Sequence, residues 1–162
     1  MQTIPIIYKL FFLYIEPISA IVGSCYAGGK PAAYLNFLAK NPSIIDANAV
    51  PPTPTLISLY QLSNLYFLFA LNEHIVLNST NSIKTWRRLL FCLLLADFGH
   101  LGTMWPLALE KGVQEVYLNP MGWNAMEWGS VGFVYAGATM RLAFLFGLGM
   151  GGQGRAMEAK RE

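Results

Sequence analysis

Four long apolar stretches separated by polar links set the pattern of this chain. The stretches cover about residues 6–27, 56–77, 86–107 and 128–150. A helix needs roughly 20 mostly apolar residues to cross the hydrocarbon core of a bilayer, and each stretch reaches that length. The pattern therefore predicts an all-α fold, in which a single domain (1–162) forms a four-transmembrane-helix bundle and ends in a polar tail (151–162).

The three links differ in character. The first, 28–55, carries five of the nine prolines, so its second half is expected to be extended or turned. Its part 31–40 can form a short interfacial helix. The second link, 78–85, is a tight polar turn. The third, 108–127, has tryptophan and tyrosine in or beside it, which is typical of a segment at a membrane surface.

The composition indicates the same class of protein. Apolar residues make up 54% of the chain and charged residues 12%, about half the roughly 25% of soluble domains. A soluble protein of 162 residues could not bury that much apolar surface. The net charge of +2 is small and dispersed, so no nucleic-acid partner is expected.

Basic residues near the ends of the apolar stretches indicate the orientation. The N-terminus, the second link and the tail hold seven lysines and arginines, whereas the first and third links hold three. Cytosolic segments carry the excess of basic residues, so the N and C termini are both predicted to be cytosolic. We expect an integral, multi-pass protein of the endoplasmic reticulum. The seven are Lys9, Lys84, Arg87, Arg88, Arg155, Lys160 and Arg161, and the three are Lys30, Lys40 and Lys111.

Ionisable residues within the apolar stretches are the candidates for chemistry. Charges inside a bilayer cost several kcal/mol, so they usually face the interior of a bundle and mark function. At ~1.5 Å per residue from the predicted cytosolic ends, Glu16 and Asp97 lie about 15–17 Å deep and Arg141 about 10 Å deep. His100 lies one turn beyond Asp97 on the same helix face. Glu73 lies only about 5 Å deep by the same count.

Two interpretations of this group stay open. In the structural one, Arg141 pairs with Glu16 or Asp97 and fixes the register of the helices. In the functional one, Asp97 and His100 are two titratable groups on one face, which is more than the neutralisation of one arginine requires. Two acids in unequal surroundings can divide into a proton donor and a base.

No motif indicates a metal or a cofactor. The chain has no His-x-x-x-His or Cys-x-x-Cys spacing and no glycine-rich phosphate loop. Its two cysteines, Cys25 and Cys92, lie in separate apolar stretches and give no disulfide framework. We therefore expect acid–base chemistry by carboxylates and a histidine, with no metal and no cofactor.

Four segments carry a resemblance to a known family: 11–17 (Phe-Phe-Leu-Tyr-Ile-Glu-Pro), 64–73 (Asn-Leu-Tyr-Phe-Leu-Phe-Ala-Leu-Asn-Glu), 96–101 (Ala-Asp-Phe-Gly-His-Leu) and 123–129 (Trp-Asn-Ala-Met-Glu-Trp-Gly). Over nearly its whole length the chain resembles a family of small fungal four-helix integral membrane proteins. In this family we include the epoxide hydrolases and cyclases of polyene-pyrone biosynthesis, in the pathways to aurovertin and citreoviridin. The resemblance implies hydrolysis of a lipophilic polyepoxide, or its cyclisation to an oxygen heterocycle, in secondary metabolism.

The candidate residues fit that reaction. Opening an epoxide needs a proton donor at the ring oxygen and a base that activates water or an internal hydroxyl. We expect Asp97 to be the base, oriented by His100, and Glu16 to be the acid, with Arg141 holding one carboxylate ionised. The reverse assignment of acid and base stays open. The substrate-binding candidates are Asn64, Gln61, Tyr14, Tyr66, Glu73 and Trp105.

Two other functions stay open. A membrane terpene cyclase or isomerase also needs one buried acid, and it needs aromatic faces that stabilise carbocations. The other alternative is a non-enzymatic carrier or scaffold. The expected partners are a lipophilic small-molecule substrate and membrane lipid, and a homodimer is expected if one copy leaves too little room for a cavity. The candidate aromatic residues are Phe98, Trp105, Phe133 and Tyr135.

Overall fold

The computed structural model describes residues 4–39 and 50–150, and in these ranges every regular element is a helix. The predicted all-α class is confirmed for the described residues. The predicted tail and residues 40–49 of the first link lie outside them. In chain order, with η marking π-helical turns, the elements are α1 (Ile6–Leu10), η1 (Phe11–Ile15), α2 (Glu16–Gly29), α3 (Pro31–Leu38), α4 (Thr53–Leu71), η3 (Asn72–Leu77), α5 (Ile83–Thr103), α6 (Trp105–Lys111), α7 (Val113–Tyr117), α8 (Ala125–Glu127), η4 (Trp128–Gly132) and α9 (Phe133–Leu145).

The first three apolar stretches lie in continuous runs of helical turns, and the fourth is helical as far as Leu145. Within the described residues, two runs, Ile6–Gly29 and Ile83–Lys111, are long and apolar enough to cross a membrane. Only 28% and 22% of their most apolar parts are buried inside the protein. Most of these apolar side chains therefore face outward, whereas a core helix of a soluble protein buries them.

The last helix ends earlier than the apolar pattern predicts. The expected end is residue 150, whereas α9 ends at Leu145. Gly147 has a φ of +76°, and the N–H of Leu148 donates back to the Ala143 carbonyl at 2.9 Å. This arrangement is a Schellman-type helix end, which needs a left-handed residue that glycine adopts without strain. The apolar sequence thus continues past the point where the backbone turns.

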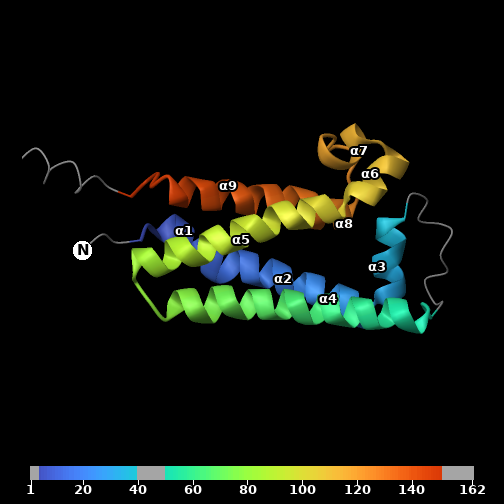
Figure 1. The fold of residues 1–162 in the computed structure, drawn as a ribbon, viewed down its shortest axis with the longest axis horizontal. Helices are drawn as coiled ribbons and strands as arrows, with labels where there is room; N and C mark the ends of the chain where they lie inside the picture. Colours follow the sequence, from blue (N-terminus) through green and yellow to red (C-terminus); the bar gives the residue numbers. More distant parts are fainter. Residues whose placement is uncertain (1–3, 40–49, 151–162) are drawn as a thin grey trace, which may run out of the picture.

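The helices pack as two pairs, α2 with α4 and α5 with α9 (Figure 1). The pairs lie close together at one end of the bundle and separate towards the other, where α3 stands across the opening. Between α2 and α4, Ser24 Oγ donates to the Ser63 carbonyl and Ser63 Oγ donates to the Ser24 carbonyl, both at 2.8 Å. A Cβ on Gly28 would lie 2.7 Å from Ser63 Oγ. Small residues of this kind allow helices to approach closely.

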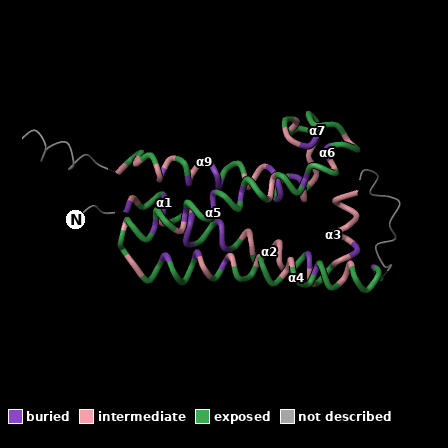
Figure 2. The backbone as a smooth tube through the Cα atoms, in the orientation of Figure 1, coloured by how far each residue is buried: buried purple, intermediate pink, exposed green. Residues whose placement is uncertain are grey.

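The main apolar core fills the narrow end of the bundle, where Figure 2 shows buried positions gathered near α1 and α5. Trp86 and Phe144 meet there with ring centroids 5.7 Å apart, and Tyr8 packs against Phe144 at 5.1 Å. The Trp86 indole N–H donates to the Thr80 carbonyl at 2.9 Å, which fastens the turn between η3 and α5 to this core. The narrow end is therefore filled, and space is left only towards α3.

A capping box starts the last long helix. Asn124 Oδ1 accepts hydrogen bonds from the backbone N–H groups of Met126 (2.8 Å) and Glu127 (2.9 Å). Glu127 Oε2 accepts one in return from the Asn124 N–H at 2.9 Å. The Asn124 side-chain amide also donates to the Phe37 carbonyl at 3.0 Å, which ties α3 to α8. One asparagine thus holds the wide end of the bundle together.

We expect Asn124→Ala to lower the free energy of unfolding by about 1–2 kcal/mol, because the helix cap and the bond to Phe37 are both lost. The midpoint of thermal unfolding, followed by circular dichroism in a single detergent, measures the change. Asn119→Ala is the matched control, since Asn119 bonds the exposed side chain of Glu115 (2.7 Å). Equal midpoints for the two variants would contradict this role of Asn124.

Candidate functional site

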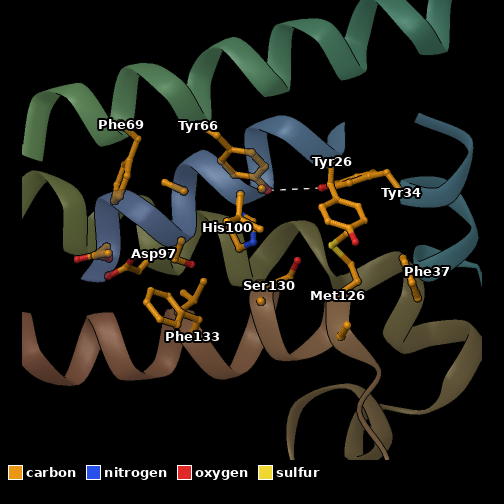
Figure 3. Close-up of a pocket in the computed structure, with 18 of the residues that line it drawn as sticks. Tyr26, Tyr34, Phe37, Tyr66, Phe69, Asp97, His100, Met126, Ser130 and Phe133 are labelled. Atoms are coloured by element: carbon orange, nitrogen blue, oxygen red, sulfur yellow. Dashed lines mark hydrogen bonds between the residues drawn. The ribbon is translucent and has the colours of Figure 1, made fainter. Parts of the chain in front are cut away.

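A cavity of about 460 Å³ lies between the two helix pairs and extends to α3. Figure 3 shows Asp97 towards one end, Tyr26 and Tyr34 towards the other, and His100 between them. Pockets of roughly 300–1,000 Å³ hold small organic ligands. One copy of the chain therefore has room for a lipophilic molecule, and the reason for expecting a homodimer does not apply.

Aromatic side chains form much of the cavity wall, and polar groups are few. The hydroxyls of Tyr34 and Tyr66 lie 3.4 Å apart where α3 approaches α4 (Figure 3). An apolar pocket with a few convergent polar groups is the usual form of a binding site for a small molecule. The aromatic residues in the wall are Tyr26, Tyr34, Phe37, Tyr66, Phe69 and Phe133, and the ionisable ones besides tyrosine are Glu16, Asp97 and His100.

Arg141 joins the acids of this bundle into one cluster. Its Nη1 donates to Asp97 Oδ2 at 2.6 Å, and its Nη2 donates to Glu16 Oε1 at 2.6 Å. Nη2 also donates to Glu73 Oε1 at 3.0 Å. Each acid comes from a different helical run, and the guanidinium is fully buried. The structure thus brings together Glu16, Asp97 and Arg141, which the sequence places in overlapping zones of depth.

The surroundings of the guanidinium fit it closely. The rings of Phe12 and Phe69 each lie 5.7 Å from its central carbon, within the range of cation–π attraction. A Cβ on Gly137 would lie 2.7 Å from Arg141 Nη1 and 2.9 Å from Glu16 Oε1. Arg141 occupies the centre of the acids, and the described residues contain no group of three or more His, Cys, Asp or Glu that could hold a metal ion.

The cluster contains more carboxyl groups than positively charged groups. In the described part of the chain one guanidinium faces three carboxyl groups, so full ionisation would leave a net charge of −2. An uncompensated charge at a buried site is costly, because the surroundings solvate it poorly. We therefore expect the cluster to keep at least one proton at neutral pH. Glu16 and Asp97 face the cavity, whereas Glu73 lies behind its wall.

His100 lines the cavity on the same helix face as Asp97, as the spacing predicts. Its ring lies beside the backbone of Ser130, and its Nε2 is buried without a hydrogen-bond partner among the described residues. Asp97 is instead oriented by Arg141, through Nη1. The expectation that His100 orients Asp97 therefore has to be corrected, and His100 is left with one ring nitrogen for a ligand.

Glu73 lies much deeper in the structure than the count along the sequence predicts. It is fully buried and bonded to Arg141, not near a membrane boundary. The count along the sequence assumes that all helix ends lie at the same depth. In the structure η3 packs against η1 of the first helical run, which places Glu73 deeper than the count gives. The neighbouring His74 donates from Nδ1 to the Leu13 carbonyl at 2.7 Å. That carbonyl has no helical donor at position 17, because Pro17 lacks an N–H.

The other predicted substrate-binding residues divide into two groups. Tyr66 lines the cavity. The rest lie outside its wall: Tyr14 and Trp105 are about half exposed, and Gln61 and Asn64 are exposed on α4. These four placements are corrections. In a bundle whose inner and outer faces are both apolar, periodicity does not indicate which face of α4 turns inward.

Sequence reasoning did not assign several residues of the wall. Tyr34 and Phe37 come from α3, which lies within the expected short helix 31–40. Met126 and Ser130 come from the turns that the capping box positions. The available signal was the aromatic content of the predicted short helix, but no pattern in the sequence shows that this helix folds over the bundle.

We expect Gly137→Ala to lower the free energy of unfolding by about 1–3 kcal/mol, since the added methyl group would displace the bond between Arg141 and Glu16. Thermal unfolding in a single detergent measures the loss. Gly99→Ala is the control, because a Cβ at Gly99 meets nothing within 4 Å. If Gly137→Ala unfolds at the same temperature as Gly99→Ala, the close approach of Gly137 to the cluster is not structurally important.

Comparison with known proteins gives a family for the chain. Residues 1–151 match the model of a family described as a domain of unknown function, DUF7704. No curated protein and no solved structure matches the chain significantly. Since the match covers almost all of the 162 residues, the chain belongs to the DUF7704 family.

Proposed function

We propose that this chain is a membrane-embedded epoxide hydrolase or cyclase, which opens epoxides of a lipophilic polyketide to give diols or cyclic ethers. One observation carries the proposal. Glu16 and Asp97 both reach a largely apolar cavity with several aromatic residues in its wall, while separate nitrogens of the buried Arg141 bond to them. Two carboxyl groups at the wall of one apolar site suit acid–base chemistry on a lipophilic substrate.

The proposed reaction needs two proton transfers. One carboxylic acid donates its proton to the epoxide oxygen as the carbon–oxygen bond breaks. Water, or a hydroxyl of the substrate, attacks the carbon, and the other carboxylate takes the proton that this nucleophile loses. Attack by water gives a diol and attack by an internal hydroxyl gives a cyclic ether, so the atoms balance without a cofactor.

The geometry supplies these parts. Asp97 uses Oδ2 for Arg141, so its other oxygen is available to a nucleophile in the cavity. His100, one turn further along α5 than Asp97, and Tyr66 on α4 can hydrogen-bond oxygens of the substrate, since both line the cavity and His100 Nε2 has no partner among the described residues. The aromatic wall limits the number of water molecules near the reacting carbon, which favours a single product.

We further propose that all four helical runs cross the endoplasmic reticulum membrane, with both termini cytosolic. Large apolar side chains on the outer faces support this arrangement, because Ile18, Leu65 and Leu95 are each more than half exposed. Such side chains are stable against lipid tails and costly in water. A lipophilic polyepoxide would then reach the cavity from the bilayer.

A second candidate is a membrane terpene cyclase or isomerase, favoured by the aromatic wall. Aromatic faces stabilise cations, and a cyclase needs them along the path of the migrating charge. The residues that the sequence offered for this role are mostly misplaced. Phe133 lines the cavity, whereas Phe98 and Trp105 are about half exposed and the Tyr135 hydroxyl bonds the Tyr117 carbonyl (3.2 Å). A second carboxyl group at the site favours epoxide opening with an external or internal oxygen nucleophile.

We expect Asp97→Asn to lower turnover of a lipophilic polyene epoxide by about 10²–10⁴-fold, because the amide cannot accept the proton of the nucleophile. Product formation by the protein in lipid nanodiscs measures the loss. Glu115→Gln is the matched control, since this exposed acid accepts a hydrogen bond from Asn119 in the same surface segment and does not line the cavity. Full activity of a folded Asp97→Asn protein would remove Asp97 from the mechanism.

The same assay separates the candidate functions. In water enriched with oxygen-18, a hydrolase incorporates the label into its product, whereas a cyclase that uses an internal hydroxyl does not. A terpene cyclase or isomerase turns over a prenylated substrate and leaves the polyepoxide unchanged. Turnover of neither substrate by the wild-type protein would favour the carrier or scaffold.

The proposed topology can be tested with single cysteines in a chain whose two native cysteines, Cys25 and Cys92, are replaced by serine. Asn81→Cys lies in the second link and Met121→Cys in the third, where Met121 is fully exposed. In sealed microsomes with the cytosolic face outward, we expect an impermeant maleimide to label Asn81→Cys at once. Met121→Cys should react only after permeabilisation. Labelling of both positions in sealed vesicles would contradict the four-span arrangement.

A further inference from the structure

Glu73 is a buried acid that the proposed mechanism does not use. It sits in η3, is fully buried, and does not line the cavity. Arg141 Nη2 donates both to Glu73 Oε1 (3.0 Å) and to Glu16 Oε1 (2.6 Å), so these two carboxyl groups share one nitrogen. Asp97 has the other terminal nitrogen, Nη1, as its own partner. The three acids are therefore not equivalent.

The unbonded oxygens show what relates the two glutamates. Glu16 Oε2 and Glu73 Oε2 are both buried, and neither receives a hydrogen bond from a donor in the described residues. Because their Oε1 atoms contact the same nitrogen, Arg141 Nη2, at 2.6 and 3.0 Å, the two carboxyl groups are neighbours. Two ionised carboxylates have only acceptors to offer, so they can bond only if one of them carries a proton. Adjacent carboxyl groups at a buried site hold one proton in common, because both cannot stay charged.

The surrounding contacts hold this pair in place. Pro17 follows Glu16 and lacks an N–H, and His74 follows Glu73 and donates to the Leu13 carbonyl at 2.7 Å. Both glutamates also adjoin π-helical turns, since Glu16 follows η1 and Glu73 lies within η3. Wider turns of this kind occur frequently at functional sites. The two helices are thus locked together beside the two acids.

We propose that Glu73 is a positioning residue that shares one proton with Glu16, which makes Glu16 the acid and Asp97 the base. This rests on the proposed function in one respect, that Glu16 acts on an epoxide. The shared proton passes from Glu16 to the epoxide oxygen as the carbon–oxygen bond breaks. Asp97 takes the proton of the attacking water or hydroxyl. The proton on Asp97 then returns to the glutamate pair through the cavity, which restores the starting state with no net change in the enzyme.

Infrared spectroscopy of the wild-type chain in nanodiscs, without substrate, tests the shared proton. We expect a protonated-carboxyl band at neutral pH that moves in heavy water. The band should also move when all glutamates carry carbon-13, which assigns it to glutamate without any substitution. Absence of the band, or a band that carbon-13 glutamate does not move, would overturn the proposal.

Two variants assign the proton to the pair. Glu73→Gln should abolish the band, since its amide can donate to Glu16 and leave it ionised, whereas Asp97→Asn should keep the band. The opposite pattern would place the proton on Asp97 and overturn the assignment. With a polyepoxide, Glu73→Gln should lower kcat by about 10²-fold or more and leave KM nearly unchanged. If the wild type turns over no epoxide but shows the glutamate band, the proposed function fails and the shared proton stands.

Discussion

A guanidinium buried among apolar helices needs carboxylate partners, and this requirement organises the bundle. Arg141 from the last helical run meets an acid from each of the other three, over separations of 125, 68 and 44 residues. The planar fork of arginine offers its nitrogens in fixed directions, so the acids must arrive at set positions relative to one another. Removing one partner of such a buried group leaves an uncompensated charge, which costs more than the intact pair contributes. The cluster therefore specifies the relative depth of the four runs.

Fixing the helices at this point also shapes the cavity. Between the cluster and the narrow end of the bundle, large side chains such as Phe12, Trp86 and Phe144 fill the space between the helix pairs. On its other side the pairs separate, and α3 with the capped turn at Asn124 covers the opening. The result is a cavity with several aromatic side chains in its wall and with Glu16 and Asp97 at one end. Glu16 and Asp97 thus lie on long helices, and α3 with the turns after Asn124 completes the wall.

The sequence alone predicts much of this, and its failures have physical reasons. Apolar stretches of sufficient length predict the helical runs, and rare charges within them predict that Glu16, Asp97 and Arg141 belong to one zone. The sequence did not predict which face of α4 turns towards the cavity, because the inner and outer surfaces of such a bundle are both apolar. Glu73 was misjudged because a count along one helix contains no information about how far a neighbouring helix is displaced. The contribution of α3 depends on a tertiary contact, between Asn124 and Phe37, that no local pattern encodes.

The number of acids bears on whether the cluster is structural or chemical. A buried ion pair is weak evidence for stability, since apolar residues of similar volume often replace it without loss. Fixing register would need one acid for one arginine. Here three carboxyl groups meet one guanidinium, and two of the three reach a cavity. Excess negative charge at a buried site favours the binding of protons, so we expect the cluster to hold a proton next to a space that a ligand can fill. A purely structural role explains the arginine and one of its partners, whereas the proposed proton transfer gives a role to all three acids.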